Sequence, residues 1–145
     1  MGTFGIDEEV TEKIETEKVV ELKQKPRAFA YWAVGGEDYK LKLTTADICQ
    51  LEEKWGRGLF NVMMAGDIPA LGVMLTVVQT AVKRWHHGIK FSQVQTMFDQ
   101  YVEEGGSLLS LFTDVVMPTL SVSGFFTQSQ REDLDARIEV MREDL

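Results

Sequence analysis

Hydrophobic and polar residues alternate with a period of two near residue 40. Residues 39–43 read YKLKL, and this alternation is typical of a strand with one buried face. An aromatic stretch at residues 28–34, AFAYWAV, precedes it, and Gly35 and Gly36 readily adopt the positive φ of a tight turn. The pattern predicts a β-hairpin with residues 35–38 as its turn. Its first strand would present an edge for pairing between subunits.

Beyond residue 43 the apolar residues follow a helical spacing instead. Ile48, Leu51 and Trp55 fall on one face of a helix. Thr44 stands three residues before Asp47, which is the spacing of a capping box at a helix N-terminus. The segment therefore predicts an amphipathic helix that begins just after Thr44.

A long helix with two apolar faces is predicted after Asp67. Asp67 is placed to cap this helix, and Pro69 fits its first turn. Because apolar residues occupy both sides between residues 71 and 85, we expect this helix to be central and contacted on two faces. The next helix is predicted to begin near Ser92, which has capping-box spacing to Gln95.

The C-terminal part of the chain carries the residues that we expect to meet a partner. A helix over residues 107–117 is predicted to end before Pro118. The following loop keeps Phe125 and Phe126, so it either folds back on the core or contacts a partner. A last helix, with Ser129 and Glu132 as its capping box, carries a narrow apolar stripe. The candidate partner-binding residues are Phe125, Phe126, Leu134, Ile138 and Met141.

These elements predict an α+β protein that is mostly α. An N-terminal β-hairpin would pack on a small bundle of four to five helices. Along the chain we expect a flexible charged arm at residues 1–25, a hairpin plus helical domain at residues 26–126 and an amphipathic helix at residues 127–145.

Length and charge narrow the classes of function. With 145 residues, 44% of them hydrophobic, the chain can form a core without disulfides or metals. Its formal net charge of -8 repels phosphate backbones, which argues against nucleic-acid binding. The N-terminus lacks the pattern of a secretory signal, and the apolar stretch at residues 68–82 is shorter than the about 20 residues that span a bilayer. We therefore expect a cytoplasmic protein that does not enter a membrane.

No residue pattern points to catalysis or to metal binding. Cys49 is the single cysteine, and its place beside Ile48 predicts a buried small apolar residue. His86 and His87 are adjacent, so on a helix they point about 100° apart and do not share a metal ion; at the end of the long helix they would complement the helix dipole. The glycine pairs lack the spacing of a phosphate-binding loop. We expect a protein without catalytic residues, cofactor or metal.

A more specific pattern runs through the hairpin and the helix that follows it. Its residues are Gly36, Tyr39, Leu41, Leu43, Leu51, Glu52 and Gly56, followed by Gly66, Asp67 and Ile68, a long helix and a helix that opens with Ser-x-x-Gln. This pattern, over residues 31–120, resembles the tail assembly chaperones of long-tailed phages and of gene transfer agents. The resemblance leaves the N-terminal arm and the last helix unmatched.

The resemblance implies a non-enzymatic protein of a phage or prophage that acts during virion morphogenesis. Proteins of that family bind the tape measure protein and help to recruit tail tube subunits, and they are absent from the mature particle. The alternative is a structural virion component, such as a head-tail connector or a tail-completion protein. An enzyme would need a deep pocket that holds His86 or His87 beside a carboxylate.

Overall fold

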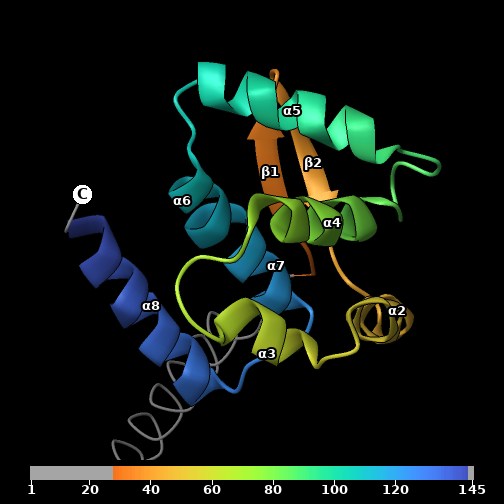
Figure 1. The fold of residues 1–145 in the computed structure, drawn as a ribbon. Helices are drawn as coiled ribbons and strands as arrows, with labels where there is room; N and C mark the ends of the chain where they lie inside the picture. The colour runs from red at the N-terminus through yellow and green to blue at the C-terminus, as the bar shows by residue number, and fades with distance from the viewer. Residues whose placement is uncertain (1–27, 144–145) are drawn as a thin grey trace, which may run out of the picture.

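The described part of the chain, residues 28–143, forms one antiparallel hairpin followed by a series of helices (Figure 1). This computed structural model confirms the predicted class, α+β and mostly α. The arm predicted at residues 1–25 lies outside the described residues. The elements are β1 (Ala30–Val34), β2 (Glu37–Leu41), α2 (Thr45–Trp55), α3 (Leu59–Met64), α4 (Leu71–Val82), α5 (Phe91–Glu103), α6 (Leu108–Ser110), the π-helical η1 (Leu111–Val116), α7 (Met117–Val122) and α8 (Gln128–Glu143).

The hairpin turns through Gly35 and Gly36 alone. Their φ angles are 63° and 78°, which is the left-handed geometry that a two-residue hairpin turn requires and that favours glycine. Val34 pairs with Glu37 across the turn, so residues 37 and 38 belong to β2. The prediction that the turn covers residues 35–38 is therefore wrong. The first strand begins at residue 30, not at residue 28.

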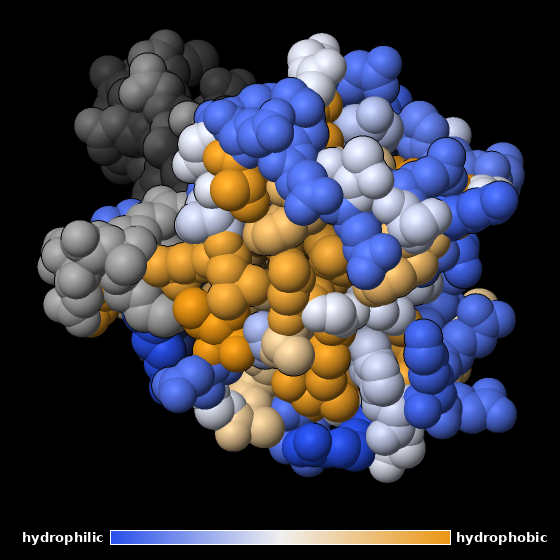
Figure 2. Space-filling model, turned by 45° about the horizontal axis from the view of Figure 1, so that its top comes forward, coloured by the Kyte–Doolittle hydropathy of each residue, from blue (hydrophilic) through white to orange (hydrophobic). Residues whose placement is uncertain are grey.

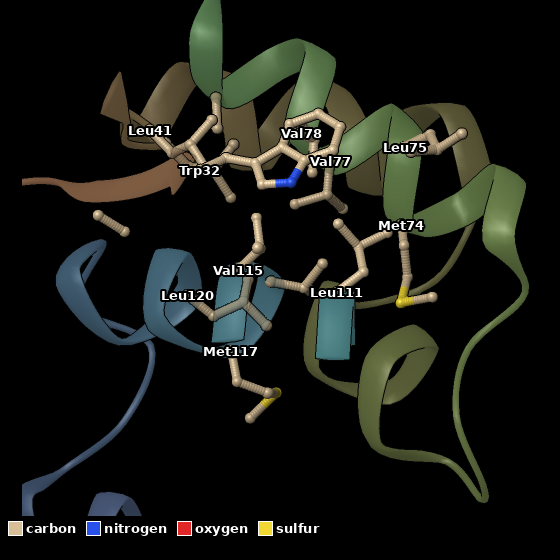
Figure 3. Close-up of a cluster of buried hydrophobic side chains, with 14 of the residues drawn as sticks. Trp32, Leu41, Met74, Leu75, Val77, Val78, Leu111, Val115, Met117 and Leu120 are labelled. Atoms are coloured by element: carbon tan, nitrogen blue, oxygen red, sulfur yellow. The ribbon is translucent and has the colours of Figure 1, made fainter. Parts of the chain in front are cut away.

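Alternate residues of β1 point into the hydrophobic core. Ala30, Trp32 and Val34 are buried, and the two residues between them are exposed. Figure 3 shows the indole of Trp32 above a cluster of side chains from α4, η1 and α7. The ring of Tyr101 from α5 meets the Trp32 ring edge-on, with centroids 5.6 Å apart. The core therefore lies between the inner face of the hairpin and the surrounding helices.

Helix α4 is the central helix, as its two apolar faces predict. Seven of its 12 residues are buried, and it contacts β2, α5, η1 and α2. Its N-cap is Ala70 and no side chain caps it, so the prediction that Asp67 caps this helix is wrong. Pro69 disfavours helical backbone in the residue that precedes it, and the helix consequently starts after the proline, beyond the reach of Asp67.

Helix α2 confirms its predicted cap. The backbone N–H of Thr44 donates to Asp47 Oδ2 at 2.9 Å, and the N–H of Asp47 donates to Thr44 Oγ1 at 3.1 Å. The prediction that Cys49 is buried is wrong, because its side chain is exposed. Leu51 is the buried residue of this helix, and a residue two positions earlier lies about 200° away around the axis.

Pro118 lies inside a helical segment that runs from residue 108 to residue 122, so the prediction that the helix ends before it is wrong. The segment changes from α to π geometry at Leu111, and the N–H of Met117 donates to the carbonyl of Phe112, five residues earlier. A new α-helical stretch then begins at Met117. Pro118 occupies the first turn of this stretch, where the backbone N–H groups have no partner within the α-helix and the missing N–H of proline therefore costs no hydrogen bond.

Two helix starts are capped two residues earlier than predicted: Thr127 and Gln130 form a reciprocal capping box, whereas at Lys90 only the backbone N–H is capped, because a lysine side chain has no acceptor. The boxes expected at Ser92 and Ser129 are not the ones observed. Ser, Thr and Gln recur near both helix starts, so several pairs have the required spacing, and packing of the helix selects one of them. The observed hydrogen bonds join Lys90 with Gln93 and Thr127 with Gln130.

Candidate functional site

The segment that carries Phe125 and Phe126 folds back on the body. Phe126 is only 7% exposed and belongs to the core, so of the two alternatives for this loop the structure shows the one in which it folds back. Its ring packs on Phe60 of α3 and on Phe125, with centroids 6.0 Å and 6.1 Å apart. Phe125 is half-buried against the same core. The aromatic residues of this loop therefore complete the core, because α3 supplies a ring for them to cover.

The other predicted partner-binding residues, Leu134, Ile138 and Met141, lie on α8. Their side chains fall outside the described residues. The same helix exposes Val140, which is 57% accessible.

Exposed hydrophobic side chains occur on the body where α5 meets α6. Val102 near the end of α5 is 46% exposed, and Leu108 at the start of α6 is 40% exposed. Phe98 lies one helical turn before Val102 and is half-buried. Figure 2 looks onto the side that carries α4, α5 and α6, and it shows hydrophobic side chains gathered in one continuous area bordered by polar ones. We call Phe98, Val102 and Leu108 the α5–α6 face.

The turn between α5 and α6 is held by short hydrogen bonds. The N–H of Gly106 donates to the carbonyl of Tyr101 at 2.8 Å, after Gly105 has taken a φ of 101°. The Tyr101 hydroxyl and Ser110 Oγ are 2.6 Å apart. Because Tyr101 also packs on Trp32, the turn is fixed to the core, and the two exposed side chains on either side of it are displayed in a defined arrangement.

The same end of α5 is tied to the tip of the hairpin. The carboxylate of Glu104 accepts the backbone N–H of Gly35 at 2.6 Å and 3.1 Å. Glu103 and Glu104 are both exposed and place negative charge beside the α5–α6 face. An apolar area with a charged border is the usual composition of a protein-binding surface.

Tyr101 gives this site a measurable pH dependence. Burial raises the pKa of its phenol above 10.0, the hydrogen bond to Ser110 lowers it and the charge of Asp114 raises it further, with a net rise. The folded state therefore holds this proton more tightly than the unfolded chain does. The resulting stabilisation is present below pH 10.0 and is lost as the pH rises through the pKa of the folded state.

We expect the free energy of unfolding to fall between about pH 9 and about pH 11, and to fall less in Tyr101→Phe. Denaturant titrations at both pH values measure the difference. The Tyr39 phenol, whose pKa burial and Glu37 also raise, leaves a residual slope in the variant. Equal slopes in the two proteins would contradict this assignment.

Metal-ligating side chains do not cluster among residues 28–143. No group of three or more His, Cys, Asp or Glu side chains in this range is placed to hold a metal ion. Helix α4 ends at Val82, so His86 and His87 lie in the turn beyond it and not in the helix as predicted. The His86 ring packs on Tyr39, with centroids 5.1 Å apart.

No single helix within residues 28–143 is long and apolar enough to cross a bilayer. Helix α5 and the segment Leu108–Val122 meet that test only when taken together, and they are bent by 116° relative to each other.

Sequence reasoning missed Val102 and Leu108 as surface residues. The helical spacing of Phe98 and Val102 places both on one apolar side of α5, and this spacing is the same whether the core covers that side or not. The Gly-Gly pair after α5 is the feature of the sequence that points to the exposure of Val102 and Leu108. It ends the helix and turns the chain, so the apolar side of α5 is left uncovered near this end.

Fold and surface together define a small, mostly helical α+β protein that displays an apolar surface at a fixed turn. The chain belongs to DUF6096, a family of unknown function, whose sequence profile matches residues 27–143. No curated protein matches the chain, and no solved structure matches it.

Proposed function

We propose that this protein is a non-enzymatic tail assembly chaperone that binds the tape measure protein of a phage or prophage. Its resemblance to such chaperones over residues 31–120 supports the class, and the exposed α5–α6 face carries the argument from the structure. Phe126 and the other large side chains of the core are buried in the folded protein, whereas Val102 and Leu108 are exposed and can contact a client.

The physical demands of this role match the properties of the surface. A tape measure protein is a long helical client with apolar stripes, and such stripes bind to a groove or face lined by apolar side chains. The complex must also stay in solution. The net charge of -8 supplies the repulsion between copies that keeps an apolar surface from self-association.

The protein would act in the host cytoplasm, before the particle is complete. In this proposal it keeps the tape measure protein soluble and helps to recruit tail tube subunits onto it. Several copies would line one client, and the edge of β1 would allow neighbouring copies to pair.

The double variant Val102→Ser, Leu108→Ser is expected to weaken the complex with the tape measure protein at least about tenfold, which is about 1.4 kcal/mol. Both side chains are exposed, so thermal unfolding should be unchanged. Co-expression with the tape measure protein encoded near the gene, followed by measurement of the soluble client, tests this. The matched control is Val140→Ser, which removes a valine of α8 that is more exposed than Val102, 57% against 46%.

Two outcomes would count against the proposal. A client that is equally insoluble with and without the wild-type chain would remove the chaperone function. A loss of binding in Val140→Ser, with normal binding in the double variant, would move the client site from the α5–α6 face to α8. Mass spectrometry of purified particles addresses the alternative, because stoichiometric copies in the particle would indicate a structural virion component.

A further inference from the structure

The outer face of the hairpin is separate from the α5–α6 face. Residues of β1 that point away from the core include Tyr31, which is 44% exposed. Tyr31 pairs across the hairpin with Lys40 of β2, so the two side chains share this outer face. The chain just before β1 adds Phe29, two residues from Tyr31 and on the same side.

Three aromatic rings form a continuous row on this side of the molecule. Phe29 packs edge-on against Tyr31, with centroids 5.1 Å apart, and against Trp85, with centroids 5.7 Å apart. Trp85 belongs to the turn after α4. A hydrogen bond of 3.1 Å from the N–H of Lys42 to the carbonyl of Ala81 holds that end of α4 beside the hairpin.

One cation lies over the middle ring of this row and a second lies over one end of it. Lys40 Nζ is 4.8 Å from the centre of the Phe29 ring, and the guanidinium of Arg84 is 5.6 Å from the centre of the Trp85 ring. Each such contact is worth about 0.5–1 kcal/mol at an exposed site, which is enough to position the side chain without neutralising its charge. Within residues 28–143, neither Lys40 nor Arg84 forms an ion pair.

The charge at this place is opposite to that of the whole chain. Four of the seven Lys and Arg residues between residues 28 and 126 lie on β2, directly after it or directly after α4. These four are Lys40, Lys42, Lys83 and Arg84. In a chain with a formal net charge of -8, these four cations give a local excess of positive charge, with Asp38 the acidic residue that shares the outer face of β2 with Lys40.

We propose that Phe29, Tyr31, Lys40, Arg84 and Trp85, the cationic aromatic face, bind a short acidic segment of a partner polypeptide. Carboxylates of the segment pair with Lys40 and Arg84, and an apolar side chain of the segment covers the exposed ring of Tyr31. A polypeptide fits better than a nucleic acid, because a long polyanion extends beyond the patch and is repelled by the rest of the surface. This inference does not depend on the client role of the α5–α6 face.

The test uses the full chain and a fluorescein-labelled synthetic peptide in which Glu alternates with Leu. Fluorescence anisotropy should show saturable binding that weakens as NaCl is raised from about 50 mM to about 300 mM, since salt screens the pairing. A peptide of the same length with Lys in place of Glu should not bind. Oligothymidylate, used as a probe of nucleic-acid binding, should bind more weakly than the acidic peptide.

The variant Lys40→Glu, Arg84→Glu should lose at least about tenfold in affinity for the acidic peptide. The matched control is Lys54→Glu, Arg57→Glu, which makes the same change of charge at the end of α2 and should bind within about twofold of the wild type. Lys40→Gln, Arg84→Gln tests the face without charge reversal, and circular dichroism confirms that each variant folds.

Three results would overturn the proposal. The first is absence of saturable binding of the acidic peptide to the wild type. The second is an equal loss in both charge-reversed variants, which would mean that only net charge matters. The third is tighter binding of oligothymidylate than of the peptide, which would assign the face to nucleic acid.

Discussion

Trp32→Ala is expected to lower the free energy of unfolding by about 3–5 kcal/mol, the largest effect of any single substitution considered for this protein. Trp32 is 1% exposed, and its indole fills the space between the hairpin and the helices α4 and α7 (Figure 3). Removal of the ring leaves a cavity that Tyr101 and the residues of α4 cannot close, because each is held by contacts of its own. Urea titration followed by far-UV circular dichroism measures the change.

The control Trp32→Phe should cost less than half as much as Trp32→Ala. Among the described residues, no hydrogen-bond partner accepts the buried indole N–H of Trp32. An unpaired buried donor costs about 1–3 kcal/mol, and phenylalanine removes this cost while keeping most of the apolar volume. Equal losses in the two variants would mean that the apolar volume restored by phenylalanine does not stabilise this site.

Gly106→Ala is expected to lower the free energy of unfolding by about 1–3 kcal/mol, as overpacking does. A Cβ at this position would lie closer than 3.0 Å to three atoms of the Tyr101 ring. The ring cannot yield easily, because Trp32 packs on one side of it and Ser110 binds its hydroxyl. The substitution should also disturb the α5–α6 face and weaken client binding. Thermal unfolding and the co-expression assay measure the two effects.

Gly72→Ala is the matched control for this substitution. Gly72 lies in the first turn of α4, and a Cβ there would meet no atom within 4 Å. Alanine favours helix relative to glycine, so this variant should be more stable by about 0.5–1 kcal/mol. Two glycine-to-alanine changes should therefore shift stability in opposite directions. Destabilisation by both would mean that the Tyr101 contact is not the cause.

The exposed apolar surface is smaller than the sequence suggests. Any of the apolar side chains after the hairpin could contact a partner, but most of them, including Phe126, are buried in the core. On helices α3, α5 and α6, the large apolar side chains that stay exposed are Phe60, Val102 and Leu108, and each lies at or next to the first or last residue of its helix. A client that binds there contacts a turn that the core holds in place, so binding need not open the fold.

Local features could be predicted from the sequence because their causes lie within a few residues of each other. The alternation in residues 39–43 and the Gly35-Gly36 pair define the hairpin, and Thr44 with Asp47 defines the start of α2. The apolar character of α4 on both sides likewise predicts its central position. Periodicity and turn chemistry depend on neighbours in the chain, and these are visible in one sequence.

Only the tertiary structure decided which side chains stay at the surface and which meet. Cys49 is exposed against expectation, Phe126 is buried in the core, and Pro118 continues a helix after a π-helical turn. Lys40 and Arg84 are 44 positions apart, yet the packing of α4 against β2 places them over neighbouring aromatic rings. Burial and the gathering of charges depend on contacts between distant segments, and no local pattern contains that information.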